Sequence, residues 1–471
     1  MNLTVKDILK ATNGELIIGN ENLICSVFSK DTRIINKGDV YIGIKGEKFD
    51  GSLFWEDALK NGASCVIVQN IEFNKEELKE YKNRTIILVE DTLQALYNIA
   101  RAKRELYNIP VIAITGSVGK TSTKDIVANV VSQKYKTLKT IGNNNNNIGL
   151  PFTILRMNDE EAMVLEMGMN HFGEISLLTS IAKPNICIIT NIGTSHIGNL
   201  GSRENILKAK LEILEGTKEP TVIINNDNDL LNKWYKINKD KYKIKTFGVS
   251  NKSDINAENI VLDKDGSTYS SYIEGKNYSI KVPIGGEHFI LNSLCATLVG
   301  EELNIEAENI IKGIQEFELT KKRMDIEELS NGVKIINDAY NASFESMQAS
   351  LRYLSGFKEN RKIAVLGDMF ELGEFSEKLH KNVGREVVKN DIDVLVCAGK
   401  DAKFIVEEAR KEGMKNEKTY YFENKEEIME LLKNSINTND VVLFKASNGM
   451  KFFELAEKLK ECINKTINYN D

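Results

Sequence analysis

The feature that most constrains this chain is the segment TGSVGKT at residues 115–121. It follows the apolar run VIAIT at 111–115, and apolar residues with helical spacing come after it, from 126 to 131. A glycine-rich turn between a buried strand and a helix is typical of a phosphate-binding P-loop. The backbone N–H groups of the turn and the N-terminus of the helix would both face phosphate oxygens. We therefore expect an α/β domain around this loop, and a purely structural glycine turn is the alternative.

The loop also predicts roles for its own side chains. Lys120 would reach the terminal phosphates of ATP, and the hydroxyl of Thr121 would bind Mg²⁺. The longer eight-residue form of the pattern would place a glycine at position 114, where this chain has Ile114, so the shorter form is present. The residues expected to contact ATP here are Thr115, Gly116, Ser117, Val118, Gly119, Lys120 and Thr121.

Length and composition limit the remaining possibilities. The chain has 471 residues, enough for about three domains. Its net charge is -6, so no basic field draws it to nucleic acid or anionic lipid. No apolar run approaches the ~18 residues of a membrane span, and the N-terminus lacks the apolar core of a signal peptide. The six cysteines are scattered, which is typical of reduced core thiols. We expect a cytoplasmic monomer with no nucleic-acid partner and no stable membrane insertion.

The pattern of strands and helices divides the chain into three segments. Residues 1–107 hold short strand candidates between helices, and Pro110 marks a break because proline disfavours helix at the residue before it. Residues 108–321 hold longer apolar runs, typical of parallel strands covered on both faces, and a hairpin is expected at 266–284. Residues 322–471 again alternate strands with helices. The main strand candidates are 40–45, 63–69, 85–90, 111–115, 162–168, 185–193, 221–225, 333–338, 362–368, 393–399 and 441–447.

Lys210 stands where a lysine is costly. The segment 202–216 has helical spacing, and Ile206, Leu207 and Ile213 lie within about 60° of Lys210 around that helix, whereas Glu212 points to the other side. A free ammonium at the centre of an apolar face is expensive to bury. Its stem could pack there with the charged head reaching solvent. Alternatively, a neutral amine could react with CO₂ and become a carbamate, an anionic oxygen ligand. Helix geometry leaves both interpretations open.

Two further residues are expected at the carboxyl edge of the central sheet. Glu166 ends the strand candidate AMVLE, and His196 follows the strand candidate CIITN. In open α/β sheets ligands bind at the carboxyl ends of the strands, where the P-loop also lies. A carboxylate, an imidazole and a carbamate would suit Mg²⁺ beside the phosphates of ATP. A salt bridge for Glu166 and a capping role for His196 are the alternatives.

These motifs, in this order, resemble the Mur ligases, the ATP-dependent amide-forming enzymes of peptidoglycan assembly. The resemblance is carried by TGSVGKTSTKD at 115–125, EMGMNHFGEI at 166–175, TNIGTSHIGNLGSRENILKAK at 190–210 and GGEHFILNS at 285–293. It implies a three-domain architecture with a central P-loop parallel-sheet ATPase domain and a C-terminal Rossmann-like domain. It also places Lys210 on the carbamylated lysine of the family and His196 on its metal-binding histidine.

The outer domains resemble the branch that joins D-alanyl-D-alanine to UDP-N-acetylmuramoyl-tripeptide. This resemblance rests on the segment SKDTRIINKGDVYIGIKGEKFDG at 29–51 and, in the C-terminal domain, on KKRMDIEEL, INDAYNAS and LGDMFELGEFSEKLH. Further nucleotide contacts implied by the resemblance are Asn292, Arg323 and Asp338. Substrate contacts implied in the same way are Ser29, Thr32, Arg33, Gly46, Asp50, Asn145, Asn146 and Asn341.

The resemblance implies a reaction through an acyl phosphate. The terminal carboxylate of the tripeptide would attack the γ-phosphate of ATP, and the amine of D-alanyl-D-alanine would then displace phosphate. One Mg²⁺ would lie with Thr121 and Glu166, and a second with His196 and carbamylated Lys210. The expected catalytic residues are Lys120, Glu166, His196 and Lys210.

Other functions remain open at this point. A different Mur ligase, or a relative such as folylpolyglutamate or cyanophycin synthetase, would share the P-loop and the metal residues. A P-loop regulator that hydrolyses ATP slowly would leave His196 and Lys210 unexplained. The third residue of the tripeptide is either lysine or diaminopimelate.

The run TIGNNNNNIGLP at 140–151 has two interpretations. Asparagine tracts are often disordered polar filler. Aligned to the family, however, the run reads G-N-x-N-N-x-I-G-x-P. The resemblance therefore implies substrate contacts for Asn145 and Asn146, whereas Asn144 and Asn147 fall on variable positions. Paired amides beside the P-loop can donate to a peptide carbonyl and accept from an amine. Three positions depart from the family's pattern: Phe289, Phe344 and Asn448.

Overall fold

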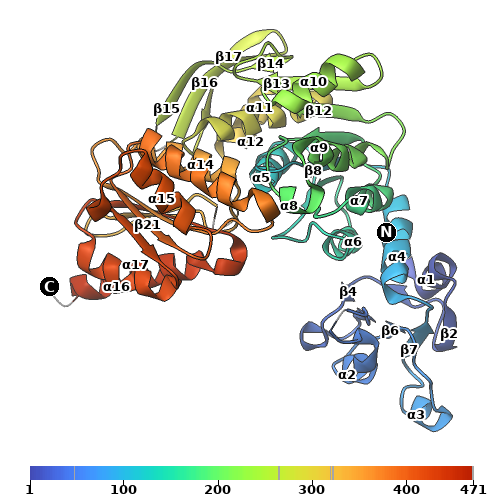
Figure 1. The fold of residues 1–471 in the computed structure, drawn as a ribbon. Coiled ribbons are helices and arrows are strands. Elements are labelled where there is room, and N and C mark those ends of the chain that lie inside the picture. The colour runs from blue at the N-terminus through green and yellow to red at the C-terminus, as the bar shows by residue number, and fades with distance from the viewer. Residues whose placement is uncertain (47, 264–265, 319, 321–322, 469–471) are drawn as a thin grey trace.

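A computed structural model describes residues 1–46, 48–263, 266–318, 320 and 323–468. The chain forms three α/β units, and Figure 1 shows the N-terminal unit, in blue, separated from the C-terminal unit, in red. The central unit, from cyan to yellow, touches both. The expected boundary between residues 321 and 322 lies outside the described residues, and the domain boundaries stay predictions.

The N-terminal unit is built on a five-stranded sheet ordered β2-β7-β6-β5-β4, in which β2 runs antiparallel to β7 and the other neighbours are parallel. Short strands β1 and β3 pair beside it. The strands are β1 Leu3–Thr4, β2 Glu15–Ile18, β3 Ile24–Cys25, β4 Phe28–Ser29, β5 Val40–Ile42, β6 Cys65–Val68 and β7 Thr85–Leu88. The helices are α1 Val5–Thr12, α2 Trp55–Lys60, α3 Lys75–Glu80 and α4 Thr92–Glu105.

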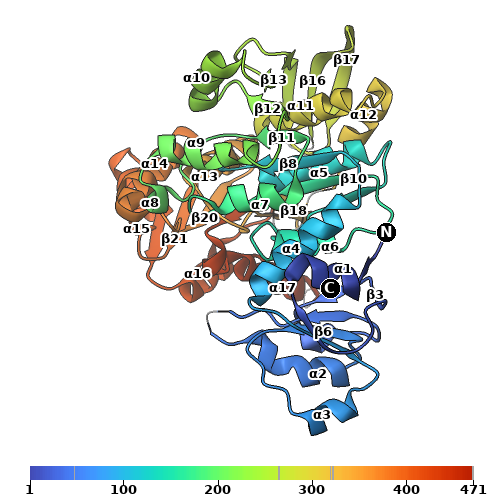
Figure 2. The same cartoon turned by 90° about the vertical axis from the view of Figure 1, so that its right-hand side faces the viewer.

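Helix α4 attaches the N-terminal unit to the central unit (Figure 2). Its buried residue Leu96 belongs to the same apolar core as the P-loop sheet. Near its C-terminal end, Arg104 Nε donates to the carbonyl of Ala182 at 2.8 Å, and Arg101 donates to Ser180 Oγ at 2.9 Å. The attachment therefore includes a packed helix as well as the short connection that contains Pro110.

The central unit contains a seven-stranded parallel sheet ordered β14-β13-β12-β11-β8-β10-β9. Every residue of β8, β10, β11 and β12 is buried, as expected for parallel strands covered on both faces. The strands are β8 Val111–Thr115, β9 Thr137–Lys139, β10 Ala162–Glu166, β11 Ile186–Ile189, β12 Thr221–Asn225, β13 Lys243–Gly248 and β14 Ile255–Asn256. The helices are α5 Lys120–Val131, α6 Gly149–Leu155, α7 Glu174–Ala182, α8 Ile197–Leu200, α9 Arg203–Leu211, α10 Asp229–Asn238, α11 Glu287–Glu302 and α12 Ala307–Gln315.

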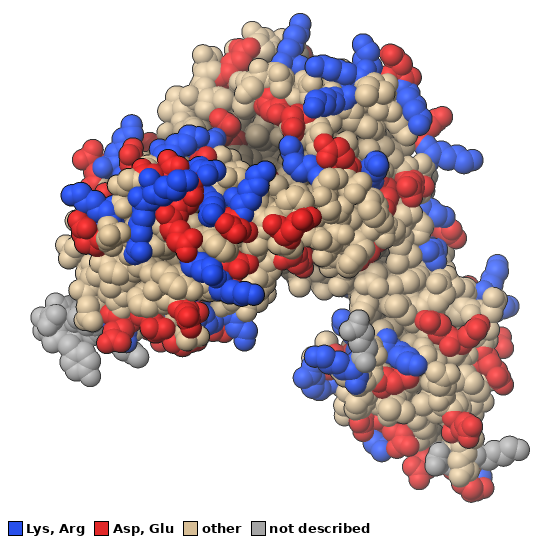
Figure 3. Space-filling model, viewed as in Figure 1, with Lys and Arg blue, Asp and Glu red and all other residues tan. Residues whose placement is uncertain are grey.

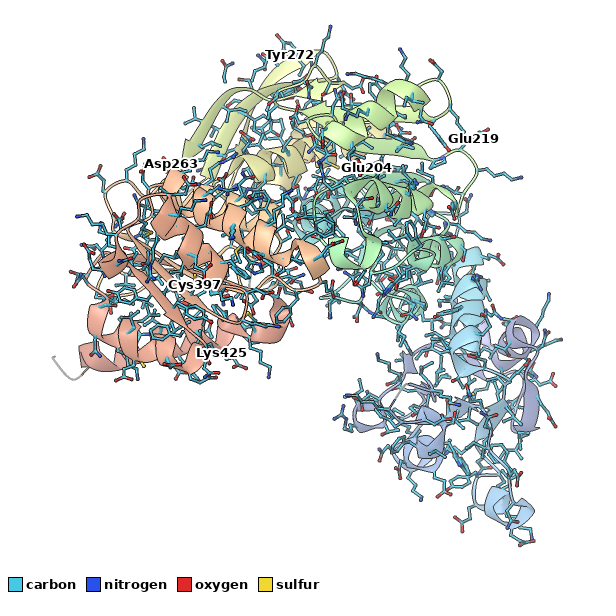
Figure 4. The ribbon with its side chains drawn as sticks, viewed as in Figure 1. Glu204, Glu219, Asp263, Tyr272, Cys397 and Lys425 are labelled. Atoms are coloured by element: carbon cyan, nitrogen blue, oxygen red, sulfur yellow. The ribbon has the colours of Figure 1, made fainter. Side chains whose placement is uncertain are left out.

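The hairpin expected at 266–284 is confirmed. Strand β16 (Gly266–Ile273) pairs antiparallel with β17 (Lys276–Val282), and β15 (Glu258–Asp263) adds a third strand. Figure 4 shows Tyr272 at the outer end of this small sheet and Asp263 at the end that faces the C-terminal unit.

The C-terminal unit has a six-stranded sheet ordered β18-β19-β23-β20-β21-β22, parallel except for β18. Five of the six cysteines are buried, including Cys397, which lies inside this unit (Figure 4). The strands are β18 Asp325–Glu328, β19 Lys334–Asn337, β20 Lys362–Gly367, β21 Val394–Ala398, β22 Thr419–Phe422 and β23 Val441–Lys445. The helices are α13 Phe344–Ser355, α14 Ser376–Lys389, α15 Lys403–Lys411, α16 Ile428–Ser435 and α17 Phe452–Asn468.

The helix expected over 202–216 ends early, because α9 stops at Leu211 and a 3-10 turn follows. Glu212 was expected to point away from the apolar face, but it is buried. Its carboxylate accepts from the backbone N of Gly173 at 2.8 Å and of Ser176 at 3.2 Å. Burial does not contradict the direction predicted for Glu212, but the helical pattern gave no sign of it: the free N–H groups at the start of α7 need acceptors, and this carboxylate supplies them.

Charged side chains of both signs are mixed over the face of the molecule shown in Figure 3. Within the described residues, none of the helices combines the length and apolar character that a bilayer crossing requires.

Candidate active site

The P-loop forms where the sequence predicts it, between β8 and α5. Gly116 has φ +154°, and a Cβ atom there would lie 1.9 Å from Thr190 Oγ1, so only glycine fits. Gly119 has φ +83° and precedes the first turn of α5. The Nζ of Lys120 donates to the carbonyl of Gly116 at 2.8 Å. The lysine thus lies over its own loop, where phosphate would bind.

Asn191, which sequence reasoning missed, supports this loop. Its backbone carbonyl accepts from Ser117 N at 3.1 Å, and its Oδ1 accepts from Val118 N at 2.9 Å. Its position as the last residue of the segment CIITN, at the carboxyl end of an expected strand, was the available signal.

Thr121 and Glu166 meet beside the P-loop. Register pairs Glu166 of β10 with Ile114 of β8, which brings its side chain to the start of α5. The hydroxyl of Thr121 donates to Glu166 Oε2 at 2.8 Å, and Asn145 Nδ2 donates to Oε1 at 2.8 Å. Both Thr121 and Glu166 are 2% exposed. A hydroxyl oxygen and a carboxylate in contact fit Mg²⁺, which prefers oxygen ligands.

Lys210 is buried, with 1% of its surface exposed. Within the described part of the chain, its ammonium has no hydrogen-bond or ion-pair partner. Burial, and secondarily the charge of Lys120, lowers the pKa of Lys210 well below its ordinary value. A buried amine that loses its proton easily is the form that can react with CO₂, so the site fits a carbamate.

His196 has φ +64° and directly precedes α8. Its Nδ1 contacts the carboxylate of Glu371, which comes from the C-terminal unit. The contact occupies one ring nitrogen and leaves Nε2 available to a ligand. Sequence reasoning missed Glu371, although it lies in the segment LGDMFELG. No group of three or more His, Cys, Asp or Glu side chains gathers as a metal site among the residues described. Carbamate and phosphate oxygens would therefore have to complete the coordination of any metal ion bound by His196.

A cleft of about 220 Å³ separates the central unit from the C-terminal unit. Two of its buried donors, Asn292 Nδ2 and Arg323 Nε, have no hydrogen-bond partner among the described residues. Unpaired buried donors are costly, so their presence indicates a ligand with acceptor atoms, such as a nucleotide. The cleft brings together eight of the predicted residues: Ser117, Val118, Gly119, Lys120, Asn292, Arg323, Asp338 and Asn341.

The C-terminal wall of the cleft also contains residues that were not predicted. The guanidinium of Arg323 lies 4.0 Å from the ring centroid of Tyr340. Asp338 accepts from Ser350 Oγ at 2.6 Å and from Lys445 Nζ. Lys445 ends β23 and is buried, so this carboxylate is fixed before any nucleotide binds. Tyr340 lies within the motif INDAYNAS, whereas Lys445 lies inside the expected strand 441–447 and gave no further signal.

The asparagine run is an ordered loop that follows β9. Besides the contact of Asn145 with Glu166, Asn146 Oδ1 accepts from the backbone N of Gly149, the first residue of α6, at 2.8 Å. Asn147 Nδ2 donates to Tyr97 Oη on α4 at 3.0 Å. Polar filler is therefore the wrong interpretation. Substrate contacts for Asn145 and Asn146 stay predictions.

The residues predicted to hold the UDP group lie in the N-terminal unit, apart from the cleft. The hydroxyl of Ser29 donates to the carbonyl of Asp31 at 3.1 Å, and Arg33 forms a 2.6 Å ion pair with the carboxylate of Asp31. This pairing lowers the pKa of Asp31 to about 2. Asp50 Oδ1 accepts from Ser52 N at 2.9 Å. The other predicted members of the set are Thr32 and Gly46.

The three departures from the family's pattern each have a place in the structure. The buried ring of Phe289 lies 4.2 Å from the ring of His288, centroid to centroid. Phe344 begins α13. Asn448 Nδ2 donates to the carbonyl of Tyr340 at 2.9 Å, which helps to fix the wall of the cleft.

Comparison with known proteins covers nearly the whole chain. The Mur ligase family catalytic domain matches residues 28–104, the Mur ligase middle domain matches 114–300, and the Mur ligase glutamate ligase domain matches 322–448. The UDP-N-acetylmuramoyl-tripeptide–D-alanyl-D-alanine ligase of Bacillus subtilis (strain 168) is 38% identical over 464 residues, covering 97% of this chain and 98% of that protein. The ligase of the same name from Escherichia coli (strain K12) is 30% identical, covering 85% and 87%.

Solved structures show the same similarity. A crystal structure of MurF from Acinetobacter baumannii superposes with a TM-score of 0.87 at 29% identity, covering 98% of this chain and 99% of that one. MurF from Thermotoga maritima in complex with ADP gives 0.81 at 29% identity, covering 93% and 98%.

Fold, P-loop and interdomain cleft thus define an ATP-binding protein of the three-unit ligase type, and the chain belongs to the Mur ligase family. Within that family it groups with MurF, as the full-length relatives and the superposed structures indicate. The expected family and fold class are confirmed.

Proposed function

We propose that the protein joins D-alanyl-D-alanine to UDP-N-acetylmuramoyl-tripeptide, with conversion of ATP to ADP and phosphate. The relatives named above carry this activity in their names over nearly their full length. The product would be the pentapeptide precursor of peptidoglycan. The proposal includes action as a monomer in the cytoplasm.

One observation supports the proposal most strongly. A P-loop lysine and a buried Thr121–Glu166 pair lie at the carboxyl edge of one parallel sheet, and Lys210 is buried as well. The charge of Lys120 contributes to the lowered pKa of Lys210, which supports a role for both amines in one site. A slow ATP hydrolase would have no use for a second buried amine, whereas carboxylate activation requires several negative groups to be held together.

Each of these residues would have its own role in the reaction. Lys120 would leave the carbonyl of Gly116 and donate to phosphate oxygens, holding the γ-phosphate in place. Thr121 and Glu166 would hold one Mg²⁺, and His196 with carbamylated Lys210 a second; bound there, the ions would neutralise charge on ATP and on the tripeptide carboxylate.

The nucleotide and the peptide would be positioned by the walls of the cleft. Asn292 and Arg323 would offer their unpaired donors to the nucleotide, and Asp338, fixed by Lys445, would accept from it. Asn341 would contact the peptide end of the substrate. The acyl phosphate hydrolyses in water, so closure of the cleft would have to exclude solvent before the amine arrives.

Release of inorganic phosphate tests the proposal. The full reaction should require both UDP-N-acetylmuramoyl-tripeptide and D-alanyl-D-alanine, and the lysine and diaminopimelate forms of the tripeptide can be compared side by side. ATP hydrolysis indifferent to both substrates would contradict the ligase function. Light scattering of the eluted protein during gel filtration tests the monomer.

A further inference from the structure

Glu371 connects the C-terminal unit to the residue of the central unit that is expected to bind metal. Its carboxylate contacts Nδ1 of His196, 175 positions away in the sequence. The imidazole is largely covered, with 20% of its side chain exposed, whereas the carboxylate is 45% exposed. Helix α8, which follows His196, lies beside the C-terminal unit in both ribbon views (Figures 1 and 2). The contact therefore exists only when the two units are together.

Backbone packing holds the two turns in place. The backbone N of Gly198 donates to the carbonyl of Glu371 at 2.9 Å. A Cβ atom on Gly198 would lie 2.6 Å from the backbone N of Gly373, closer than any side chain tolerates. Gly373 itself has φ +52°, a conformation that favours glycine. Two glycines thus let the turn that carries Glu371 approach the helix that follows His196.

A second acid fixes the other end of the same loop. Glu345, on the first turn of α13, accepts from Thr194 Oγ1 at 3.1 Å. A Cβ atom on Gly193 would lie 2.6 Å from Cδ of Glu345, so this approach is equally close. The loop from 193 to 198 is therefore held at Thr194 by the carboxylate of Glu345 and at His196 by the carboxylate of Glu371.

The chemistry of imidazole gives this arrangement a consequence. A neutral histidine carries one N–H, and a carboxylate at Nδ1 holds that proton there and leaves the lone pair on Nε2. We propose that Glu371 is a positioning residue: docking of the C-terminal unit fixes His196 in the tautomer and orientation that bind a divalent cation through Nε2. The metal residues would thus be complete only when the C-terminal unit is docked on the central unit, which couples activation of the carboxylate to the position of that unit. The inference rests on the proposed function and adds its coupling to domain docking.

The tautomer can be measured without any turnover. The chain has four histidines, so ¹⁵N-labelled histidine gives a simple NMR spectrum, and a His196→Gln protein assigns the signal. In the metal-free wild-type protein His196 should carry its proton on Nδ1. In Glu371→Ala the proton should move substantially to Nε2. The same tautomer in both proteins, or Nε2–H in the wild type, would overturn the inference.

Kinetics provide the second measurement. Glu371→Ala should lower kcat about tenfold to hundredfold and raise the Mg²⁺ concentration needed for half-maximal rate, as loss of a partner behind a metal ligand does. The KM for ATP should change little, because Glu371 does not line the nucleotide cleft. Glu371→Gln keeps an acceptor oxygen and should retain most of the turnover. Equal losses in Gln and Ala variants, or no loss in Ala, would contradict the positioning role.

Two further variants distinguish the loss of docking of the C-terminal unit from a nonspecific effect of mutating this turn. Glu374→Ala removes an exposed carboxylate from the same turn and should leave kcat unchanged. Gly198→Ala adds the Cβ that would meet Gly373, while alanine suits the helix itself, so it should reproduce the losses of Glu371→Ala. Wild-type kcat in Gly198→Ala would refute the coupling to docking. A wild-type protein that makes no ligation product would instead refute the proposed function and leave the tautomer result standing.

Discussion

Replacement of Asn145 by alanine should weaken catalysis through Glu166. The carboxylate of Glu166 is buried and receives side-chain hydrogen bonds from Thr121 on one oxygen and from Asn145 on the other. A hydrogen bond to a charged group contributes about 1.5–3 kcal/mol, so its loss corresponds to roughly tenfold to hundredfold. We expect kcat/KM for ATP to fall by that factor in Asn145→Ala, because Glu166 would no longer be held in position for Mg²⁺.

The assay is phosphate release at saturating peptide substrates, with ATP and Mg²⁺ varied separately. Asn144→Ala is the matched control, since it removes a neighbouring exposed amide from the same loop. A thermal unfolding curve for each variant checks that the loop remains folded. If Asn145→Ala and Asn144→Ala both retain wild-type kcat/KM, the contact with Glu166 has no catalytic importance and the reasoning fails.

Three other changes test separate parts of the site. Lys210→Ala should nearly abolish turnover, with partial rescue by a short-chain carboxylic acid; wild-type turnover in that variant would rule out the carbamate. Asn147→Ala loses the bond to Tyr97 and should lower the free energy of unfolding by about 1 kcal/mol while kcat hardly changes, as denaturant titration and the ligation assay would show. Burial lowers the pKa of His288 to about 4. As the pH falls, the His288 side chain takes up a proton at a higher pH in the unfolded chain than in the folded one. The free energy of unfolding should therefore fall as the pH drops from about 6.5 towards 4. His288→Gln should flatten that decline in thermal midpoints, and an unchanged decline would contradict it.

The sequence predicted those parts of the fold in which local pattern and tertiary environment agree. The strands around the P-loop are continuous apolar runs, and β8, β10 and β12 appear within the expected ranges. The P-loop itself was predictable because Gly116 and Gly119 require positive φ, and few other sequences place glycines at that spacing before Lys-Thr.

Contacts between distant segments were less predictable. Glu212 has a charged side chain on a helical pattern, and only the free N–H groups of α7 explain why it is buried. Glu371 and Glu345 act on a loop more than 140 positions away, so no local spacing indicates them. Within the asparagine run, identical letters concealed different contacts, because neighbouring side chains in a loop point to different partners.

The central claim is that the tripeptide carboxylate takes the γ-phosphoryl group of ATP before the new amide bond forms. Labelling that carboxylate with ¹⁸O tests it directly, since one labelled oxygen must leave with phosphate when the amine attacks the acyl carbon. Mass spectrometry of the released phosphate should find one ¹⁸O atom in each phosphate for every pentapeptide formed. Pentapeptide formed together with unlabelled phosphate would contradict the account.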